Sequence, residues 1–122
     1  MARNVLVVDD SASMRALVCG TLKGLGFKTT EAGNGQEALM FIKMMSSVDL
    51  IITDLNMPVM DGITFVQNVR KLAALKFVPV LLLTTETRTE HKEKAKAAGA
   101  TGWLTKPFDP KQLTAVVQRI LP

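Results

Sequence analysis

Two adjacent aspartates, Asp9 and Asp10, directly follow a short run of apolar residues. One acid at such a place could simply cap a helix beginning near Ala12, because Asp10 or Ser11 can accept hydrogen bonds from free backbone N–H groups. A third acid, Asp54, follows a second apolar run in the same way. Carboxylates that lie close together repel one another unless a cation lies among them, and Mg²⁺ prefers oxygen ligands. The three acids are therefore candidates for a magnesium site.

Two further apolar runs end in side chains that could act together with these acids. Thr84 follows one run and offers a hydroxyl group, and Lys106 follows another and offers an ammonium group. Alone, a threonine at a strand end is explained by its preference for strands. The argument for chemistry therefore depends on whether the fold brings all five side chains to one place.

The pattern of apolar residues predicts short strands separated by helices. We expect strands at residues 5–8, 27–31, 50–53, 78–83 and 102–104. Helical spacing predicts a helix from near Ala12 to Gly26, one opened by the turn at 33–35, and others around 63–69, near 89–98 and over 113–121. Strand and helix therefore alternate along the whole chain.

Five strands that alternate with five helices imply a parallel sheet with helices on both faces. We expect an α/β fold of the flavodoxin-like, doubly wound (βα)5 type, with a five-stranded parallel sheet in the order 2-1-3-4-5. In this fold ligands bind at the carboxyl ends of strands 1 and 3. The carboxylates of Asp9, Asp10 and Asp54 should therefore meet there, with Thr84 and Lys106 beside them.

The composition is that of one ordinary globular domain. The chain has 122 residues, of which 48% are hydrophobic and 21% charged, and we expect residues 1–122 to form a single domain. No apolar run approaches the roughly 18 residues of a membrane span, so we expect a soluble, cytoplasmic protein without a membrane partner. A net charge of +4 permits an acidic partner, but scattered lysines and 5% aromatic residues argue against direct nucleic-acid binding. Cys19, the single cysteine, is expected in the core.

A longer motif gives these residues a family context. The segment DLNMPVMDG at 54–62 resembles the loop that follows the phosphorylated aspartate in receiver domains of two-component response regulators. With Asp9-Asp10, Thr84 and the run at 106–108, the resemblance extends over essentially the whole chain. It is strongest to single-domain chemotaxis receivers of the CheY type. It implies a phosphorylation-activated switch that catalyses its own phosphorylation and slow dephosphorylation, and not an enzyme that turns over a separate substrate.

The resemblance also implies roles for the acids. Asp54 would be the nucleophile that accepts a phosphoryl group from a histidine kinase or its phosphotransfer domain. Mg²⁺, the one implied cofactor, would be held by Asp10, Asp54 and the main-chain carbonyl of Asn56, with Asp9 acting largely through water. Lys106 would neutralise charge on the phosphoryl group, since such transfers depend on positioning and charge neutralisation.

Further residues would carry the signal. Thr84 would donate its hydroxyl to the phosphoryl oxygens, and Trp103 occupies the position of the family's aromatic switch residue. An indole that is too bulky to move is the alternative for Trp103. The bond between Lys106 and Pro107 resembles the family's cis peptide.

Asn56 and Glu86 lie two places after the acceptor aspartate and the switch threonine, and this polar pair resembles that of rapidly self-dephosphorylating chemotaxis receivers.

The expected output surface is formed by the fourth helix, the fifth strand and the fifth helix. Its lysines favour an acidic, amphipathic downstream target, such as a segment of a flagellar motor switch protein; they are Lys92, Lys94, Lys96 and Lys111. A dedicated phosphatase is a further possible partner, and we expect a monomer. The kinase, the target and any dimerisation on activation are not specified by the sequence.

The strongest rival hypothesis is a phosphatase of the haloacid dehalogenase type, which also forms an aspartyl phosphate at a strand end. Proteins of that class carry the motif Asp-x-Asp, in which the second acid shuttles a proton. In this chain Asn56 stands at the position of the second acid, and an amide cannot shuttle a proton. A flavin-binding protein and a receiver that only binds partners are weaker alternatives. This chain lacks the extended phosphate-binding loop that a flavin-binding protein would need after its first strand. A receiver that only binds partners would not explain why every phosphorylation residue is present.

Overall fold

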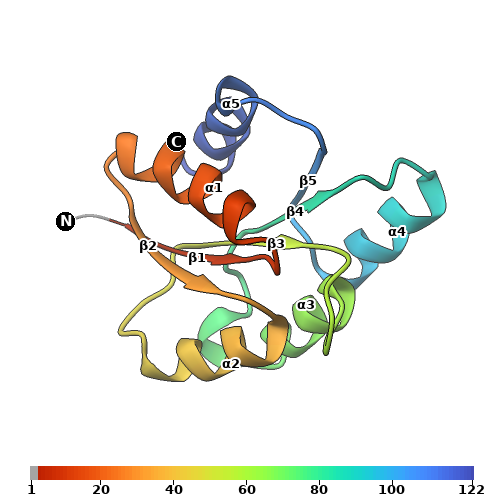
Figure 1. Ribbon diagram of the computed structural model, residues 1–122. Coiled ribbons are helices and arrows are strands. Elements are labelled where there is room, and N and C mark those ends of the chain that lie inside the picture. The colour runs from red at the N-terminus through yellow and green to blue at the C-terminus, as the bar shows by residue number, and fades with distance from the viewer. Residues whose placement is uncertain (1–2) are drawn as a thin grey trace.

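The computed structural model describes residues 3–122, so that residues 1 and 2 of the predicted domain 1–122 lie outside the described residues. Strands and helices alternate along this part of the chain (Figure 1). The strands are β1 (Asn4–Val8), β2 (Lys28–Ala32), β3 (Leu50–Asp54), β4 (Val80–Thr84) and β5 (Gly102–Thr105). The helices are α1 (Ala12–Gly24), α2 (Gly35–Met44), α3 (Gly62–Arg70), the short 3₁₀ helix η1 (Ala73–Leu75), α4 (Thr89–Ala98) and α5 (Pro110–Ile120).

The strands form one parallel sheet in the order β2-β1-β3-β4-β5, which confirms the predicted doubly wound, flavodoxin-like fold. The register pairs Val8 of β1 with Thr53 of β3, and Thr84 of β4 with Thr105 of β5. The residues that follow these strands therefore reach the same edge of the sheet. This register brings Asp9, Asp54 and Lys106 together.

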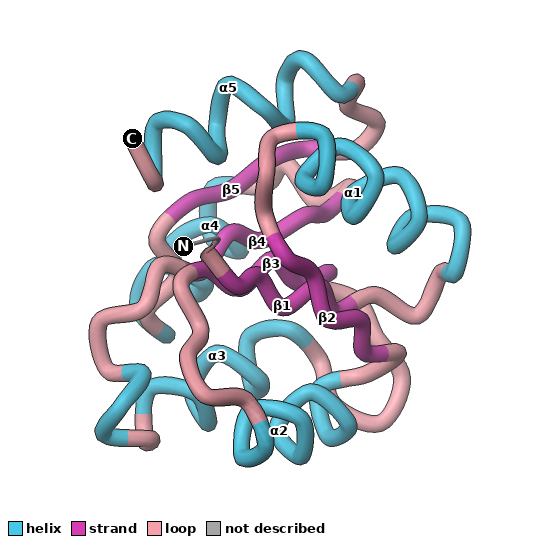
Figure 2. Tube along the Cα trace, turned by 90° about the vertical axis from the view of Figure 1, so that its left-hand side faces the viewer, coloured by secondary structure: helices cyan, strands magenta, loops and turns pink. Residues whose placement is uncertain are grey.

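The sheet separates two apolar cores. Alternate residues of a strand point to opposite faces, so that Leu6 and Val8 contribute to one core while Val5 and Val7 contribute to the other. The first core lies under α2, α3 and α4, and the second lies under α1 and α5. Figures 1 and 2 both show α1 and α5 on one side of the sheet and α2 and α3 on the other. The buried Cys19 belongs to the second core, as expected.

The predicted strand boundaries are correct to within one residue except at the start of β4. The strand begins at Val80 and not at Val78. Pro79 has no backbone N–H to donate to a neighbouring strand, and the carbonyl of Val78 accepts a hydrogen bond from Arg70 at 2.6 Å instead. The strand therefore starts at Val80, although the Pro79 carbonyl still accepts a hydrogen bond from the N–H of Ile51 in β3 at 3.0 Å.

Side-chain caps fix the starts of four helices. Ser11 caps α1, Asn34 caps α2, Asp61 caps α3 and Asp109 caps α5. Because Ser11 and not Asp10 is the cap of α1, the Asp10 carboxylate is free for another role. Within the described residues, every helix is too short or too polar to cross a lipid bilayer.

Candidate functional site

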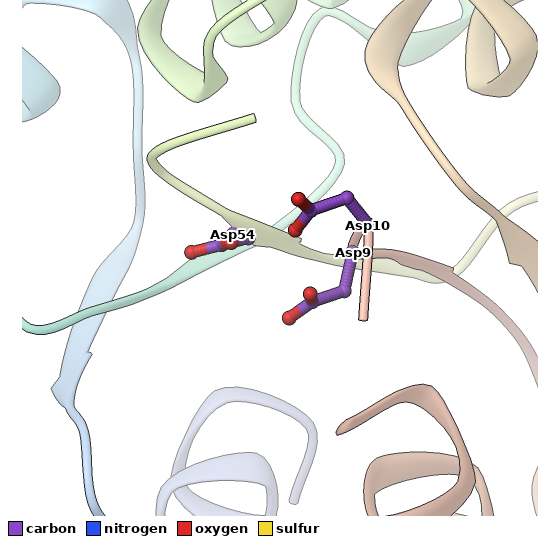
Figure 3. Close-up of side chains that lie close together, drawn as sticks. All are labelled: Asp9, Asp10 and Asp54. Atoms are coloured by element: carbon purple, nitrogen blue, oxygen red, sulfur yellow. The ribbon is translucent and has the colours of Figure 1, made fainter. Parts of the chain in front are cut away.

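Three carboxylates meet at the carboxyl ends of β1 and β3 (Figure 3). Asp9 and Asp10 directly follow β1, and Asp54 is the last residue of β3. One carboxylate oxygen from each lies within 4.8 Å of the others. Asp9 and Asp54 are buried, with 1% and 6% of their surfaces exposed, whereas Asp10 is exposed. The three acids thus form a cluster that is buried at Asp9 and Asp54 and open to solvent at Asp10.

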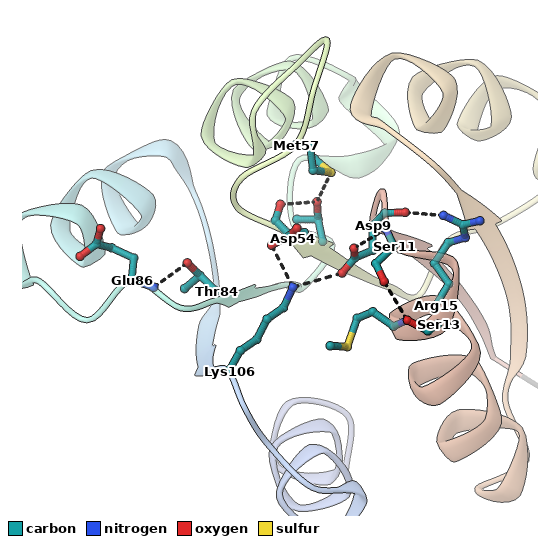
Figure 4. Close-up of polar contacts among 11 residues, drawn as sticks. Asp9, Ser11, Ser13, Arg15, Asp54, Met57, Thr84, Glu86 and Lys106 are labelled. Carbon is teal, nitrogen blue, oxygen red and sulfur yellow. Dashed lines mark hydrogen bonds and ion pairs between the residues drawn. The ribbon is translucent and has the colours of Figure 1, made fainter.

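Lys106 lies between two of these acids (Figure 4). Its Nζ is 3.2 Å from Oδ1 of Asp54 and donates to Oδ2 of Asp9 at 3.3 Å. The residue follows β5 directly, and the peptide bond between Lys106 and Pro107 is cis. The predicted ammonium group therefore lies beside the predicted acceptor carboxylate.

Burial is the main influence on the Asp54 carboxyl group. Removal from water raises the pKa of Asp54 above its ordinary value, and the neighbouring charge of Asp9 raises it further. Lys106 acts in the opposite direction through its charge and its hydrogen bond. With all three acids ionised, the cluster and the single ammonium group carry a formal charge of about −2, from three carboxylates and one lysine.

These donors fit a magnesium ion. Mg²⁺ binds through oxygen atoms, usually one or two carboxylates together with water molecules. The cluster supplies three carboxylates at close quarters, and the exposed Asp10 leaves the ligand side open to water. A divalent cation would also balance the excess negative charge of the cluster.

The loop after Asp54 holds Asn56 at the surface and returns tightly to α3. The N–H of Gly62 donates to the carbonyl of Leu55 at 2.7 Å. A Cβ atom on Gly62 would lie 2.5 Å from the carbonyl oxygen of Asp54, so only glycine fits this approach. Within the loop, Val59 adopts a positive φ of 71°. Asn56 is exposed, so its side chain is accessible from the site's solvent side.

Two residues of the β1–α1 segment support the site and were not predicted from the sequence. The N–H of Ser11 donates to Oδ1 of Asp9 at 2.9 Å, and Nη1 of Arg15 donates to the Asp9 carbonyl at 2.6 Å. Arg15 also pairs with Glu31 of β2 at 3.1 Å. Since Arg15 is six residues from Asp9 and sixteen from Glu31, no local pattern indicates these contacts. The Asp9 carboxylate is consequently fixed from both sides, by Ser11 and by Lys106.

Thr84 and Glu86 lie on the other side of Asp54. Thr84 is fully buried, and its Oγ1 accepts a hydrogen bond from the N–H of Glu86 at 2.9 Å. Figure 4 shows the Glu86 carboxylate directed away from Asp54. It accepts from Nε and Nη2 of Arg88 at 2.9 and 3.0 Å and from the N–H groups of residues 87 and 88, which lowers its pKa to about 2. His91 Nε2 is 3.9 Å from the same carboxylate.

Trp103 is half-buried on β5 and packs against the core under α4. Among the described residues, its indole Nε1 is a buried nitrogen without a hydrogen-bond partner. The ammonium group of Lys92 on α4 lies 5.9 Å from the centre of the ring. A cavity of about 210 Å³ adjoins Trp103, Lys92 and Lys96. The side chain of Trp103 thus lies between the backbone of β5 and helix α4.

Comparison with known proteins places the chain in a family. Residues 5–118 match the family described as the response regulator receiver domain. The chain is 39% identical over 117 residues to chemotaxis protein CheY-3 of Vibrio cholerae, covering 95% of this chain and 89% of that protein. It is 37% identical to chemotaxis protein CheY of Pseudomonas aeruginosa, covering 95% and 94%. The chain therefore belongs to the response regulator receiver domain family of two-component systems.

Solved structures agree with this assignment. The structure of Vibrio cholerae chemotaxis response regulator CheY4 superposes with a TM-score of 0.94 at 48% identity, covering 98% of this chain and 99% of that one. The receiver domain of the sensor histidine kinase PA1611 from Pseudomonas aeruginosa superposes with a TM-score of 0.88 at 26% identity, covering 99% and 98%. The fold is thus shared by receivers with quite different sequences.

Proposed function

We propose that this protein is a switch in which Asp54 accepts a phosphoryl group from a histidine kinase or its phosphotransfer domain. The observation that carries the proposal is the position of Asp54. Its buried carboxylate ends β3, lies 3.2 Å from the Lys106 ammonium group, and forms a cluster with those of Asp9 and Asp10. A nucleophile, a cation and a metal-binding acid pair are the parts that phosphoryl transfer to a carboxylate requires.

The transfer itself is simple in chemical terms. A carboxylate oxygen of Asp54 attacks phosphorus and forms an O–P bond while the N–P bond of the donor phosphohistidine breaks, and the electron pair of that bond returns to the imidazole nitrogen. Lys106 stabilises the negative charge on the phosphoryl oxygens. Mg²⁺ held by Asp10, Asp54 and the main-chain carbonyl of Asn56, with Asp9 acting through water, would supply further charge neutralisation. The receiver domain of PA1611 holds magnesium in its active-site cleft, which supports magnesium as the cation bound here.

Thr84 is suited to pass the signal onward. Its Oγ1 already accepts the N–H of Glu86, so its own hydroxyl proton is available for a phosphoryl oxygen. A charge-assisted hydrogen bond of this kind is stronger than a neutral one. We infer that Thr84 moves toward the phosphoryl group, and that Trp103 and α4 respond to this movement.

The output surface is the face of α4, β5 and α5. Ala95 is the one fully buried residue among the ten of α4, so this helix is held by little apolar contact and can be repositioned at low cost. Relatives named as chemotaxis proteins support a role in chemotaxis, with a motor switch protein as the target. Charge reversal at Lys92 and Lys111 should weaken binding of that target, whereas reversal at Lys23 and Lys28, which lie elsewhere, should not.

The phosphoryl group should be short-lived. The resemblance to rapidly self-dephosphorylating receivers implies that Asn56 and Glu86 flank the path of the attacking water, for which the Glu86 carboxylate would have to turn from Arg88 toward Asp54. Loss of label over minutes in buffer containing Mg²⁺ would support this part of the proposal, and retention for many hours would contradict it.

Labelling with acetyl phosphate tests the central claim. The wild-type protein should gain one phosphoryl group in a Mg²⁺-dependent reaction, detected by intact mass, and Asp54→Asn should gain none. Asp61→Asn is the matched control, because Asp61 is an exposed acid near the site and asparagine also caps helices well. The control should label like the wild type. Persistent labelling of Asp54→Asn at another residue would overturn the assignment.

A further inference from the structure

We propose that a groove at the amino ends of the strands is a second docking surface, and that it binds an acidic, amphipathic segment of a partner protein. The groove has a volume of about 460 Å³ and lies between the α2–β3 connection and the α3–η1 segment. Ile42, Met45 and Val48 line one side, and Leu72 and Leu75 line the other. These side chains pack against the core under α2, α3 and α4, so the floor of the groove is a continuation of that core.

The first wall of the groove is fixed by β1. Asn4 and Asp49 exchange main-chain and side-chain hydrogen bonds: the Asn4 N–H donates to Oδ2 of Asp49 at 2.7 Å, and the Asp49 N–H donates to the Asn4 carbonyl at 2.8 Å. Nδ2 of Asn4 donates to Oγ of Ser47 at 2.9 Å. Residues 45–49 are therefore held in place although they form no helix or strand.

The second wall is fixed by Arg70. Its Nη1 donates to the carbonyls of Leu75 at 3.0 Å and Val78 at 2.6 Å. These bonds hold η1 and the segment after it against the end of α3. Because both walls are already ordered, a ligand would not have to order them on binding, and this lowers the entropic cost of association.

The charges around the groove are positive. Of the described residues that line it, Lys43 is the charged one. Lys71 and Lys76 are exposed and adjoin the second wall in the sequence. The nearest acid of the first wall, Asp49, keeps its negative charge, but it does not line the groove and is outnumbered by the three lysines. An acidic ligand therefore matches this rim, and complementary charges would steer its approach.

Large apolar side chains extend the surface beyond the groove. Met44 at the end of α2 is 77% exposed, and Phe77 after η1 is 87% exposed, with the Lys76 ammonium group 5.6 Å from its ring centre. An apolar floor with a basic rim fits a helix that presents leucines on one face and glutamates beside them. This surface is remote from the acids, because the four residue steps of β3 between Leu50 and Asp54 span about 13 Å. Docking here and phosphorylation at Asp54 can therefore occur together.

The test uses a synthetic helical peptide with leucines on one face and glutamates on the other. Titrated into the ¹⁵N-labelled protein, it should shift the amide resonances of residues 42–48 and 72–77. The Lys43→Glu/Lys76→Glu variant should bind it at least tenfold more weakly. Lys23→Glu/Lys28→Glu is the matched control, since it makes the same change of charge at exposed positions away from the groove, and it should bind like the wild type.

The result of this binding test does not depend on whether Asp54 is phosphorylated. The peptide should bind Asp54→Asn as it binds the wild type, whether or not Asp54 proves to be the phosphoacceptor. Shifts confined to α4, β5 and α5, no shifts at millimolar peptide, or equal weakening by both lysine pairs would overturn the proposal. So would concentration-dependent dimerisation in sedimentation that the groove variant abolishes, because a second copy of the chain would then be the occupant.

Discussion

The Glu86 side chain is unusual for an exposed loop because all its hydrogen bonds come from one neighbour and the adjoining backbone. Nε and Nη2 of Arg88 donate hydrogen bonds to the Glu86 carboxylate, and the backbone N–H groups of Thr87 and Arg88 are two further donors. Glu86 also donates its own N–H to Thr84. The same residue therefore holds the Thr84 hydroxyl and closes the loop that leads into α4.

A pH titration should reveal this arrangement. The pKa of Glu86 is lowered from its ordinary 4.5 to about 2, first by the hydrogen bonds from Arg88. Because the folded-state pKa is the lower one, these contacts stabilise the fold above about pH 4.5 and are lost as pH falls toward 2. Side-chain carboxyl ¹³C shifts should give a midpoint near 2, and Arg88→Ala should move it toward 4.5. An unchanged midpoint in Arg88→Ala would contradict the contacts described.

Gly62 should be intolerant of even one methyl group. In Gly62→Ala the new Cβ would lie 2.5 Å from the Asp54 carbonyl oxygen and 2.8 Å from Cα of Leu55, so the backbone must shift. We expect a loss of about 1–3 kcal/mol in the free energy of unfolding, measured in urea. Gly20→Ala is the control: nothing lies within 4 Å of its Cβ, and helix propensity should raise stability by up to about 1 kcal/mol. Equal effects of the two substitutions would contradict this account.

The acids and the lysine of the site could be predicted because each directly follows an apolar run, and parallel strands end at one edge. The residues that hydrogen-bond to these side chains and hold them in place could not be predicted. Arg15 reaches Asp9 from the next helix, and Arg88 folds back on Glu86 within a loop. Such contacts depend on side-chain directions in three dimensions, which no spacing in the sequence encodes.

At the scale of helices and strands, Arg70 connects three segments. It donates to the carbonyls of Leu75 and Val78 after α3 and, through Nε and Nη2, to the carbonyl of Gly99 at the end of α4. Burial lowers the pKa of its guanidinium group. The arginine thus donates to the Val78 and Gly99 carbonyls and adds a second donor to the Leu75 carbonyl, which also accepts from the N–H of Val78 at 3.4 Å.

Removing this arginine should be costly. Arg70→Met keeps much of the aliphatic stem but removes the donor to the Val78 and Gly99 carbonyls, and we expect a loss of about 2–3 kcal/mol in the free energy of unfolding. Arg119→Met, at an exposed position on α5, is the matched control and should change stability by less than about 0.5 kcal/mol. Thermal and urea denaturation would both measure the difference. Equal stability of the two variants would show that Arg70 is not a structural link.

The order and type of the main elements followed from apolar periodicity, because each strand or helix face that packs on a core must repeat its apolar residues. Apolar periodicity did not predict the 3₁₀ helix η1 or the late start of β4. The late start of β4 depends on Pro79 and on the hydrogen bond from Arg70 to the Val78 carbonyl, and η1 ends at Leu75, whose carbonyl also accepts from Arg70. The side chain of one arginine, five and eight residues away from these two carbonyls, thus contributes to both boundaries, and apolar periodicity does not reveal it.

At the scale of the whole molecule, Trp103 should report the passage of the signal. It is the chain's only tryptophan, and it lies between β5 and the ammonium group of Lys92 on α4. Adding beryllofluoride with Mg²⁺ mimics the phosphoryl group, and repacking of the indole should shift the emission maximum beyond the change caused by Mg²⁺ alone. Asp54→Asn should show only the effect of Mg²⁺. An emission maximum and acrylamide accessibility that are the same in both states would mean that the indole does not move.

The attachment of α4 determines the direction in which it can travel. Its carboxyl end is tied to the rest of the molecule through Gly99 and Arg70, whereas its amino end depends on the exposed pair of Glu86 and Arg88. We therefore expect that, if the helix moves on activation, it pivots about Gly99. With ten residues and a length of about 15 Å, a tilt of about 10° moves the amino end by about 2.5 Å and leaves the carboxyl end nearly still. The expected displacement of α4 therefore increases from Gly99 toward the amino end of the helix. It is greatest beside the loop that connects α4 to Thr84.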